Sequence, residues 1–117
     1  MMILIAGPYR SRTNDDPKLM RENLVKLESY ALHIFRLGHV PMIGEWVALP
    51  LIELAASKKI GDDAWNEVQY PVAHRLLEKC DAVLRISGES KGADQDVRIA
   101  NDRGLKVYYR LDDIPRA

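Results

Sequence analysis

The sequence predicts an α/β protein of three layers, in which a mainly parallel sheet of four to five strands carries helices on both faces, as in flavodoxin-like and Rossmann-like folds. Short apolar runs rich in β-forming residues alternate along the chain with longer stretches of helical periodicity. Parallel strands need crossover connections, and the alternation supplies a helix for each of them. With 117 residues and no internal repeat or linker, we expect residues 1–117 to form one domain around one core.

The first strand and the first helix have clear sequence signals. Met2–Ala6 is continuously apolar and is followed by Gly and Pro, which is typical of a strand covered on both faces. Asp16 supplies a helix cap and Pro17 a first-turn proline. Apolar residues then recur at spacings of three and four, so we predict one amphipathic helix that continues to Gly38.

The middle of the chain is more apolar. Residues 39–43 predict a short second strand, and Pro41 favours an edge position for it. Residues 45–56 are apolar almost all round, although Pro50 makes a continuous helix unfavourable. We expect a short buried helix here that serves as a dimer face or a lid.

The second half repeats the alternation of helix and strand. Asp62 and Asp63 predict the cap of a long helix, which we expect Pro71 to kink. The remaining predicted elements are a strand at 82–86, a helix from 93 to 103 stopped by Gly104, and a last strand at 106–109.

Composition excludes several classes of partner. Seventeen basic residues balance seventeen acidic ones, so no overall field favours nucleic acid or an anionic membrane, and a small molecule fits better. The single cysteine, Cys80, rules out an internal disulfide and suits a reducing compartment, and we expect it to be buried. The apolar N-terminus is too short for a signal peptide or a membrane span, so we expect a cytoplasmic protein. The three histidines have no metal-site spacing, and we expect no metal or cofactor.

Two loops are the predicted binding region. Ligands of parallel α/β sheets lie at the carboxyl ends of the strands, where the loops 7–12 and 87–92 are expected on one edge. Small residues in the loop 87–92, before the predicted helix at 93–103, leave backbone N–H groups free for a phosphate or sugar. The dipole of that helix adds a positive end. Asp96 is expected in the first turn of that helix, facing the ligand.

Three segments resemble one family. They are residues 3–9 (ILIAGPY), 80–84 (CDAVL) and 90–96 (SKGADQD), and they span nearly the whole chain. Together they resemble the nucleoside 2-deoxyribosyltransferase-like superfamily, in its small domain-of-unknown-function branch, which is similar to deoxynucleoside monophosphate N-glycosidases. The resemblance implies that Tyr9 lies beside the sugar and that Asp96 is the nucleophile. The family's nucleophile is usually glutamate, so the aspartate here has a shorter reach. The resemblance also implies that the Ser/Gly loop before the nucleophile is formed by Ser87, Gly88, Ser90 and Gly92.

These residues support glycosyl chemistry. A carboxylate below the anomeric carbon stabilises an oxocarbenium-like state and then bonds to it; release to water gives a hydrolase and release to a second base gives a transferase, and both remain open. Tyr9 is expected to hold the carboxylate or a sugar hydroxyl, and Asp81 or Asp94 to contact or protonate the base. The arginines of the first loop favour a nucleoside monophosphate over a free nucleoside. The predicted catalytic residues are Asp96 and Tyr9, and the predicted substrate-binding residues are Gly7, Pro8, Arg10, Ser11, Arg12, Asp81, Ser87, Gly88, Ser90, Gly92 and Asp94.

Other interpretations stand beside this one. The helix dipole alone explains an acid in a first turn. The alternative function is a nucleotide-binding module of the same fold that is weak or inactive in catalysis. The reason for considering it is that Asp96 has a shorter side chain than the family's usual glutamate. A dinucleotide or flavin carrier is disfavoured because Gly-x-Gly-x-x-Gly is missing. The apolar stretch 46–56 predicts a homodimer or a higher homo-oligomer, and the family resemblance implies that a neighbouring subunit completes the pocket.

Overall fold

A computed structural model describes residues 1–117 and confirms the α/β class. Its four strands form one sheet in the order β2-β1-β3-β4, with all neighbours parallel. No helix is long and apolar enough to cross a membrane. The elements are β1 (Met2–Ala6), α1 (Pro17–Glu28), α2 (Ala31–Arg36), β2 (Val40–Met42), α3 (Gly44–Leu54), α4 (Asp63–Leu77), β3 (Ala82–Arg85), α5 (Lys91–Asp102), β4 (Lys106–Tyr108) and the 3₁₀ turn η1 (Leu111–Asp113).

Strand β1 lies inside the sheet and strand β2 at its edge. Leu4 of β1 pairs with Met42 of β2 on one side and with Val83 of β3 on the other. Pro41 lacks an N–H donor, and an edge strand has a side on which none is needed, so the predicted edge position is confirmed. Four residues of β1 are at most 5 % exposed, as the unbroken apolar run predicts.

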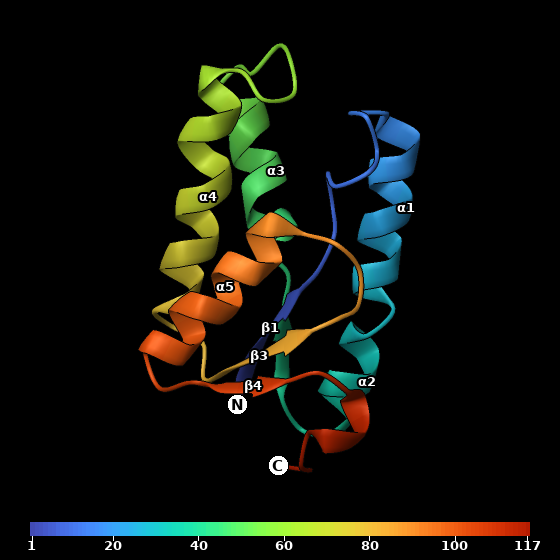
Figure 1. Cartoon of the computed structure of the whole chain (residues 1–117), viewed down its shortest axis with the longest axis vertical. Helices are drawn as coiled ribbons and strands as arrows, with labels where there is room; N and C mark the ends of the chain where they lie inside the picture. The colour runs from blue at the N-terminus through green and yellow to red at the C-terminus, as the bar shows by residue number, and fades with distance from the viewer.

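Helices α1 and α2 lie on one face of the sheet, and α4 and α5 lie on the other (Figure 1). An apolar cluster fills the space between the sheet and each helical layer. Ile3 and Ile5 of β1 pack toward Leu27 of α1 and Ile34 of α2. The alternate β1 residues, Leu4 among them, pack toward α4 and α5, where Cys80 is buried as expected. Side chains of consecutive strand residues point to opposite faces, so one short strand supplies both cores.

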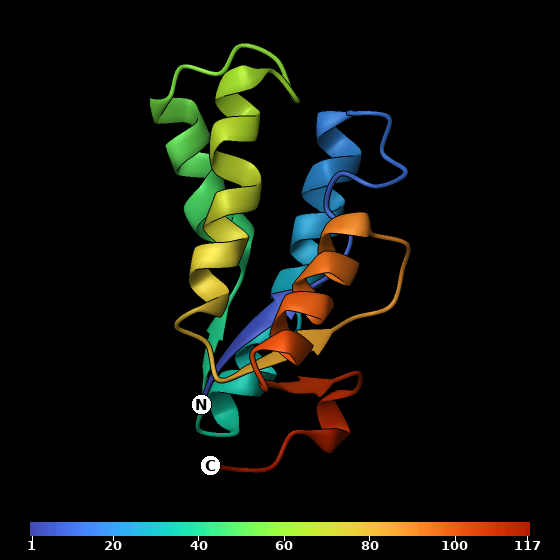
Figure 2. The ribbon, with the colours of Figure 1, turned by 60° about the vertical axis from the view of Figure 1, so that its left-hand side comes forward.

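A third cluster lies beyond the sheet, where α3 and α4 pack against each other (Figure 2). It joins Met20 of α1, Ala48 and Ile52 of α3, and Trp65 of α4. Tyr9 and Leu49 are partly buried against it. The helices therefore enclose a space past the carboxyl ends of the strands.

The predicted helix from Pro17 to Gly38 is wrong in one respect, because it is divided at Ser29 and Tyr30 into α1 and α2. The Ser29 hydroxyl donates to the carbonyl of Lys26 at 2.6 Å. Serine side chains that bond to nearby backbone carbonyls compete with helical continuation. Gly38, with a φ of 94°, ends the second piece as predicted.

Two further predictions are corrected. Helix α3 runs continuously through Pro50, and it is not buried throughout, since Leu54 is 81 % exposed. Helix α5 begins at Lys91, two residues earlier than predicted, because Ser90 is its N-cap and accepts a bond from the N–H of Ala93. Asp96 therefore lies in the second turn, where the helix dipole no longer explains an acid.

Asp62 organises the connection between α3 and α4. Its carboxylate accepts bonds from the Ser57 hydroxyl and from the backbone N–H groups of Lys58, Lys59 and Trp65, at 2.7 to 3.1 Å. These donors, the Trp65 N–H first, lower the pKa of Asp62 to about 2. The predicted cap is confirmed, and it also holds the preceding loop.

We predict that Asp62→Ala lowers the melting temperature, because four donors lose their acceptor. The Asp63→Ala variant changes the neighbouring exposed acid and is the matched control. Asp62 has a lower pKa in the folded protein than in the unfolded chain, so its contribution is present above pH 4 and is lost as the pH falls toward 2. Thermal melts of the parent and both variants at pH 7 and pH 2.5 check this. Equal melting temperatures of the two variants at pH 7 would contradict it.

Candidate functional site

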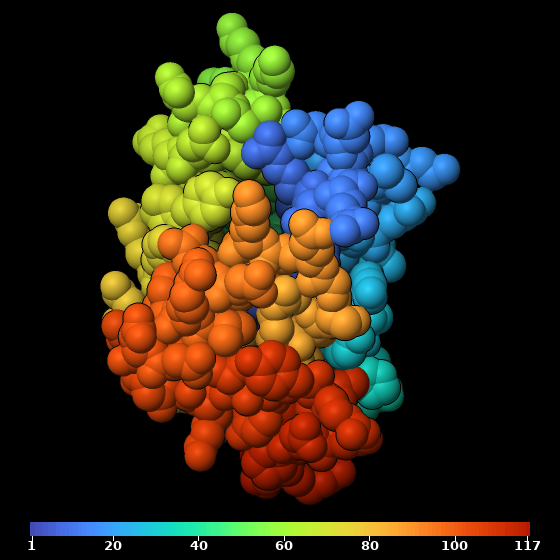
Figure 3. All heavy atoms as spheres, viewed as in Figure 1, coloured from blue at the N-terminus to red at the C-terminus, as the bar shows by residue number.

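A cavity of about 480 Å³ opens at the carboxyl edge of the sheet. The end of β1 and its loop, the start of α3, one face of α4 and the start of α5 line it. Figure 3 shows a hollow where the loop after β1 (blue) meets α4 (yellow-green) and the first residues of α5 (orange). The two loops predicted to share one edge of the sheet do share this region. Its volume is within the range, about 300–1,000 Å³, of small-molecule sites.

The bases of the two loops are tightly packed where they follow β1 and β3. A Cβ added to Gly7 would lie 2.4 Å from Cγ1 of Ile86, so only glycine fits where β1 ends. Gly88 has a φ of 119°, and its missing Cβ would lie 2.6 Å from Cγ of Pro8. The absence of a side chain at these two glycines therefore allows the two loops to approach each other closely.

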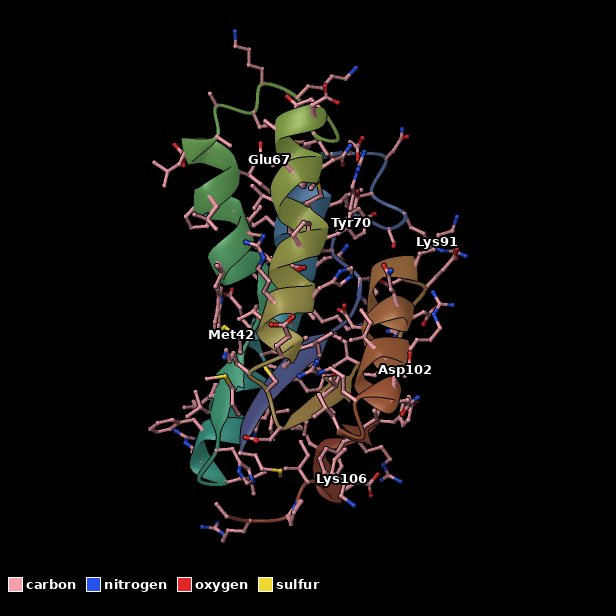
Figure 4. The ribbon with its side chains drawn as sticks, turned by 90° about the vertical axis from the view of Figure 1, so that its left-hand side faces the viewer. Met42, Glu67, Tyr70, Lys91, Asp102 and Lys106 are labelled. Carbon is pink, nitrogen blue, oxygen red and sulfur yellow. The ribbon has the colours of Figure 1, made fainter.

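Helix α4 contributes one face to the cavity. Trp65, Gln69 and Ala73 recur every fourth residue and line it together with Tyr70. Oε1 of Gln69 is buried and has no hydrogen-bond partner in the chain. Figure 4 shows Tyr70 on α4 and Lys91 at the start of α5, on opposite sides of the space that the loop after β1 enters. Helix α4 therefore lines the cavity with two aromatic side chains, Trp65 and Tyr70, and with the amide of Gln69.

Asp96 lines the cavity from the second turn of α5 and is partly buried. Its pKa is raised to about 7, mainly by burial and to a smaller extent by repulsion from Glu45. Arg85 acts in the opposite direction. Because Asp96 forms no ion pair, its carboxylate has no fixed partner inside the protein.

Glu45 is a second acid in the same cavity. It lies in the first turn of α3, directly after the edge strand β2. Burial raises its pKa to about 7, against a smaller lowering by its own backbone N–H. Asp96 and Glu45 are therefore a pair of acids that burial and mutual repulsion keep from both being charged at neutral pH.

Tyr9 lines the same cavity as the two acids. Burial is the main cause that raises the pKa of its phenol, repulsion by Glu45 adds to it, and Arg21 opposes it. The side-chain amide of Asn23 donates to the carbonyl of Tyr9 at 2.8 Å and fixes the loop against α1. The phenol therefore lies where a ligand beside Asp96 and Glu45 would meet it.

The two arginines at the rim are already paired with acids. Nε of Arg10 donates to Asp15 at 2.6 Å, and Nε of Arg12 donates to Glu89 at 2.8 Å. The Arg12 and Glu89 side chains are 80 % and 63 % exposed, so water and salt weaken this pair. An anionic ligand can therefore replace Glu89 at Arg12 at small cost.

The structure brings together eight of the thirteen predicted site residues. Both predicted catalytic residues line the cavity. The eight are Gly7, Tyr9, Arg10, Ser11, Arg12, Ser90, Gly92 and Asp96, whereas Pro8, Asp81, Ser87, Gly88 and Asp94 do not line it.

Asp81 and Asp94 have structural partners instead. Asp81 precedes β3 and accepts a bond from the N–H of Met2 at 2.8 Å, so it lies at the amino edge of the sheet, away from the cavity. Asp94 is exposed on α5 and pairs with Arg85 at 3.0 Å. The expectation that one of them contacts or protonates a base has no support from their positions.

Sequence reasoning missed Glu45, Gln69 and Tyr70. Glu45 is the first charged residue after the eight residues 37–44, which include β2, and it lies in the first turn of a mainly apolar helix, which is the available signal. Gln69 and Tyr70 flank no motif. Their role depends on how α4 is rotated about its axis, which the sequence does not specify.

Comparisons with known proteins do not assign the chain: no family model matches it, and no curated protein or solved structure matches it. The resemblance described from the sequence therefore remains an expectation. No group of three or more His, Cys, Asp or Glu side chains is arranged to hold a metal ion.

We predict that the site costs stability above neutral pH. The pKa values of Glu45 and Asp96 are higher in the folded protein, so the folded state binds more protons than the unfolded chain between pH 4 and 7. Stability contributed by these groups is therefore present at low pH and lost as the pH rises through 7. Asp96→Asn should raise the free energy of unfolding, relative to the parent, by on the order of 1–3 kcal/mol more at pH 8 than at pH 5.

Urea unfolding at the two pH values measures this difference. Asp102→Asn, at an exposed position on the same helix, is the matched control. A stability difference between Asp96→Asn and the parent that is the same at pH 5 and pH 8 would show that Asp96 is not desolvated.

Proposed function

We propose that this chain cleaves the N-glycosidic bond of a nucleoside or nucleoside monophosphate, with Asp96 as a carboxylate nucleophile. The observation that carries the proposal is the position of Asp96, whose unpaired carboxylate lines the cavity at the carboxyl edge of the sheet. The resemblance to the nucleoside 2-deoxyribosyltransferase-like superfamily supports the same residue. The cavity has room for a base and a sugar.

In the proposed reaction, an Asp96 carboxylate oxygen bonds to C1′ of the sugar while the bond from C1′ to the base nitrogen breaks. The bonding pair remains on the nitrogen, which takes up a proton. Water, or a second base, then attacks C1′ and releases the Asp96 carboxylate. Water gives free base and free sugar, and a second base gives a new nucleoside.

The protonation of Asp96 limits this chemistry. A nucleophilic carboxylate must be ionised, and the pKa of Asp96 is raised to about 7 by burial and by Glu45. We therefore expect turnover to fall as the pH decreases below 7. Tyr9 would bind a sugar hydroxyl, and its presence in the lining of the same cavity supports this role.

The rim favours a phosphate on the sugar. Arg10, Arg12 and Lys91 all line the mouth of the cavity, and Ser11 adds a hydroxyl. Guanidinium groups bind phosphate with two parallel hydrogen bonds. These groups support a nucleoside monophosphate as the preferred substrate.

The homodimer predicted from residues 46–56 is kept as part of this proposal. Leu51 and Leu54 of α3 expose 42 % and 81 % of their surface, and Trp46 exposes 39 %. Nε1 of Trp46 nevertheless donates to Glu28 of α1 at 2.8 Å, which fixes the ring in place. A second copy would cover the exposed leucines.

We predict that the parent releases free base from at least one member of a panel of deoxynucleosides and their monophosphates, and that Asp96→Asn lowers kcat by about 1,000-fold or more because the nucleophile is lost. Asp96→Glu keeps a carboxylate and should retain turnover. Chromatography of the released base measures both, with Asp102→Asn as the control.

Base release by Asp96→Asn at the parent's rate contradicts the proposed nucleophile. No base release by the parent, together with stabilisation of the protein against heat by a nucleotide, identifies a binding module instead.

We predict that Arg12→Ala raises KM for a monophosphate about tenfold and leaves KM for the corresponding nucleoside unchanged, because only the phosphate contacts the guanidinium. Arg116→Ala, exposed near the end of the chain, is the control. Steady-state kinetics with both substrates test this. An equal rise in KM for both substrates would place Arg12 elsewhere than at the phosphate.

A further inference from the structure

Two acids reach the cavity from opposite sides of one strand. Glu45 follows β2 and Asp96 follows β3, and β1 lies between these strands. Neighbouring strands are about 4.8 Å apart, so the ends of β2 and β3 are separated by roughly 10 Å. Both side chains line the space above the end of β1. A sugar bound there would lie between the start of α3, which carries Glu45, and the first turns of α5, which carry Asp96.

The two acids differ in their surroundings. Arg85 lowers the pKa of Asp96, and this guanidinium is held in place by the carbonyls of Ile86 and Gly88 and by Asp94. No cation acts on Glu45, whose surroundings oppose its charge through burial. Burial raises the pKa of both acids to about 7, so near neutral pH the pair can carry a single proton. A nucleophilic Asp96 requires that proton to be on Glu45.

The remaining groups that line the cavity are neutral side chains near the pair and charged side chains at the rim. Tyr9 from the β1 loop is a neutral phenol, because its pKa is raised. Helix α4 contributes the amide of Gln69 and the phenol of Tyr70. The basic and acidic residues at the rim are Arg10, Arg12, Asp15, Glu89 and Lys91, and Arg21 of α1 acts on Tyr9.

Gln69 supplies an independent sign that a polar group binds beside the acids. Its buried Oε1 has no hydrogen-bond partner in the chain. A buried acceptor without a donor costs about 1–3 kcal/mol, and a ligand that donates an N–H recovers it. Nucleobases carry such N–H groups on their edges.

We propose that Glu45 is the acid–base residue of this site and that Asp96 and Glu45 act from opposite sides of the sugar. The inference rests on the proposed function. As Asp96 bonds to C1′, the Glu45 carboxyl gives its proton to the departing base nitrogen, which keeps the electron pair of the broken bond. The Glu45 carboxylate then accepts a proton from the water that attacks C1′, so both acids return to their starting states.

The first test compares two leaving groups. Glu45→Gln should lower kcat by about 100- to 10,000-fold on a purine deoxynucleoside monophosphate, whose base needs a proton to leave. On the N7-methylated form of the same nucleotide, whose base is already cationic, the loss should be less than about tenfold. Glu53→Gln, exposed on the same helix, is the matched control.

The outcomes separate the two proposals. Equal losses with both nucleotides, or no loss with either, overturn the acid–base role of Glu45 while leaving Asp96 as the nucleophile. No base release by the parent from either nucleotide overturns the proposed glycosidase function, and the proton transfer with it.

The second test does not depend on turnover. Carbon-13 NMR of the Glu45 carboxyl group in the parent should show a titration well above the ordinary range for glutamate, and Asp96→Asn should shift the titration of Glu45 to lower pH because a neighbouring negative charge is removed. A Glu45 carboxyl that is fully ionised at pH 5.5, or a Glu45 titration unchanged by Asp96→Asn, overturns the proposed pair.

Discussion

The burial of β1 on both faces is the constraint on which the rest of the structure depends. Its five residues have β2 on one side, β3 on the other and a helical layer above and below. A strand enclosed in this way has one register and one direction, so the loop that follows it can leave only at one edge. Helices α3 and α5 start at that same edge, and the cavity is the space between them and the loop.

The two acids of the cavity lower the stability of the fold. Glu45 and Asp96 are held where water is scarce, and neither has an ion-pair partner. A fold selected for stability alone would place apolar or paired residues there. Two acids that oppose each other's ionisation are what a reaction needs when one group must be charged while the other carries a proton.

The sequence predicted the parts of the molecule that local patterns determine. Strand β1, the caps at Asp16 and Asp62, and the edge position of β2 each follow from a residue's own chemistry. Asp96 and Tyr9 were found through the motifs around them. Glu45 and Gln69 were missed because tertiary packing, and not a motif, brings α3 and α4 over the end of β1. Asp81 was misplaced because its position before β3 puts it at the amino edge.

Gly7 restricts which positions around the cavity tolerate substitution. The contact between Gly7 and Ile86 leaves no room for a methyl group unless the Ile86 side chain moves. The outer loop residues, Ser11 and Lys91 for example, carry no comparable restriction. Ligand preference can therefore be engineered by substitutions in the outer loop residues, whereas a substitution at Gly7 has to be accompanied by repacking of Ile86.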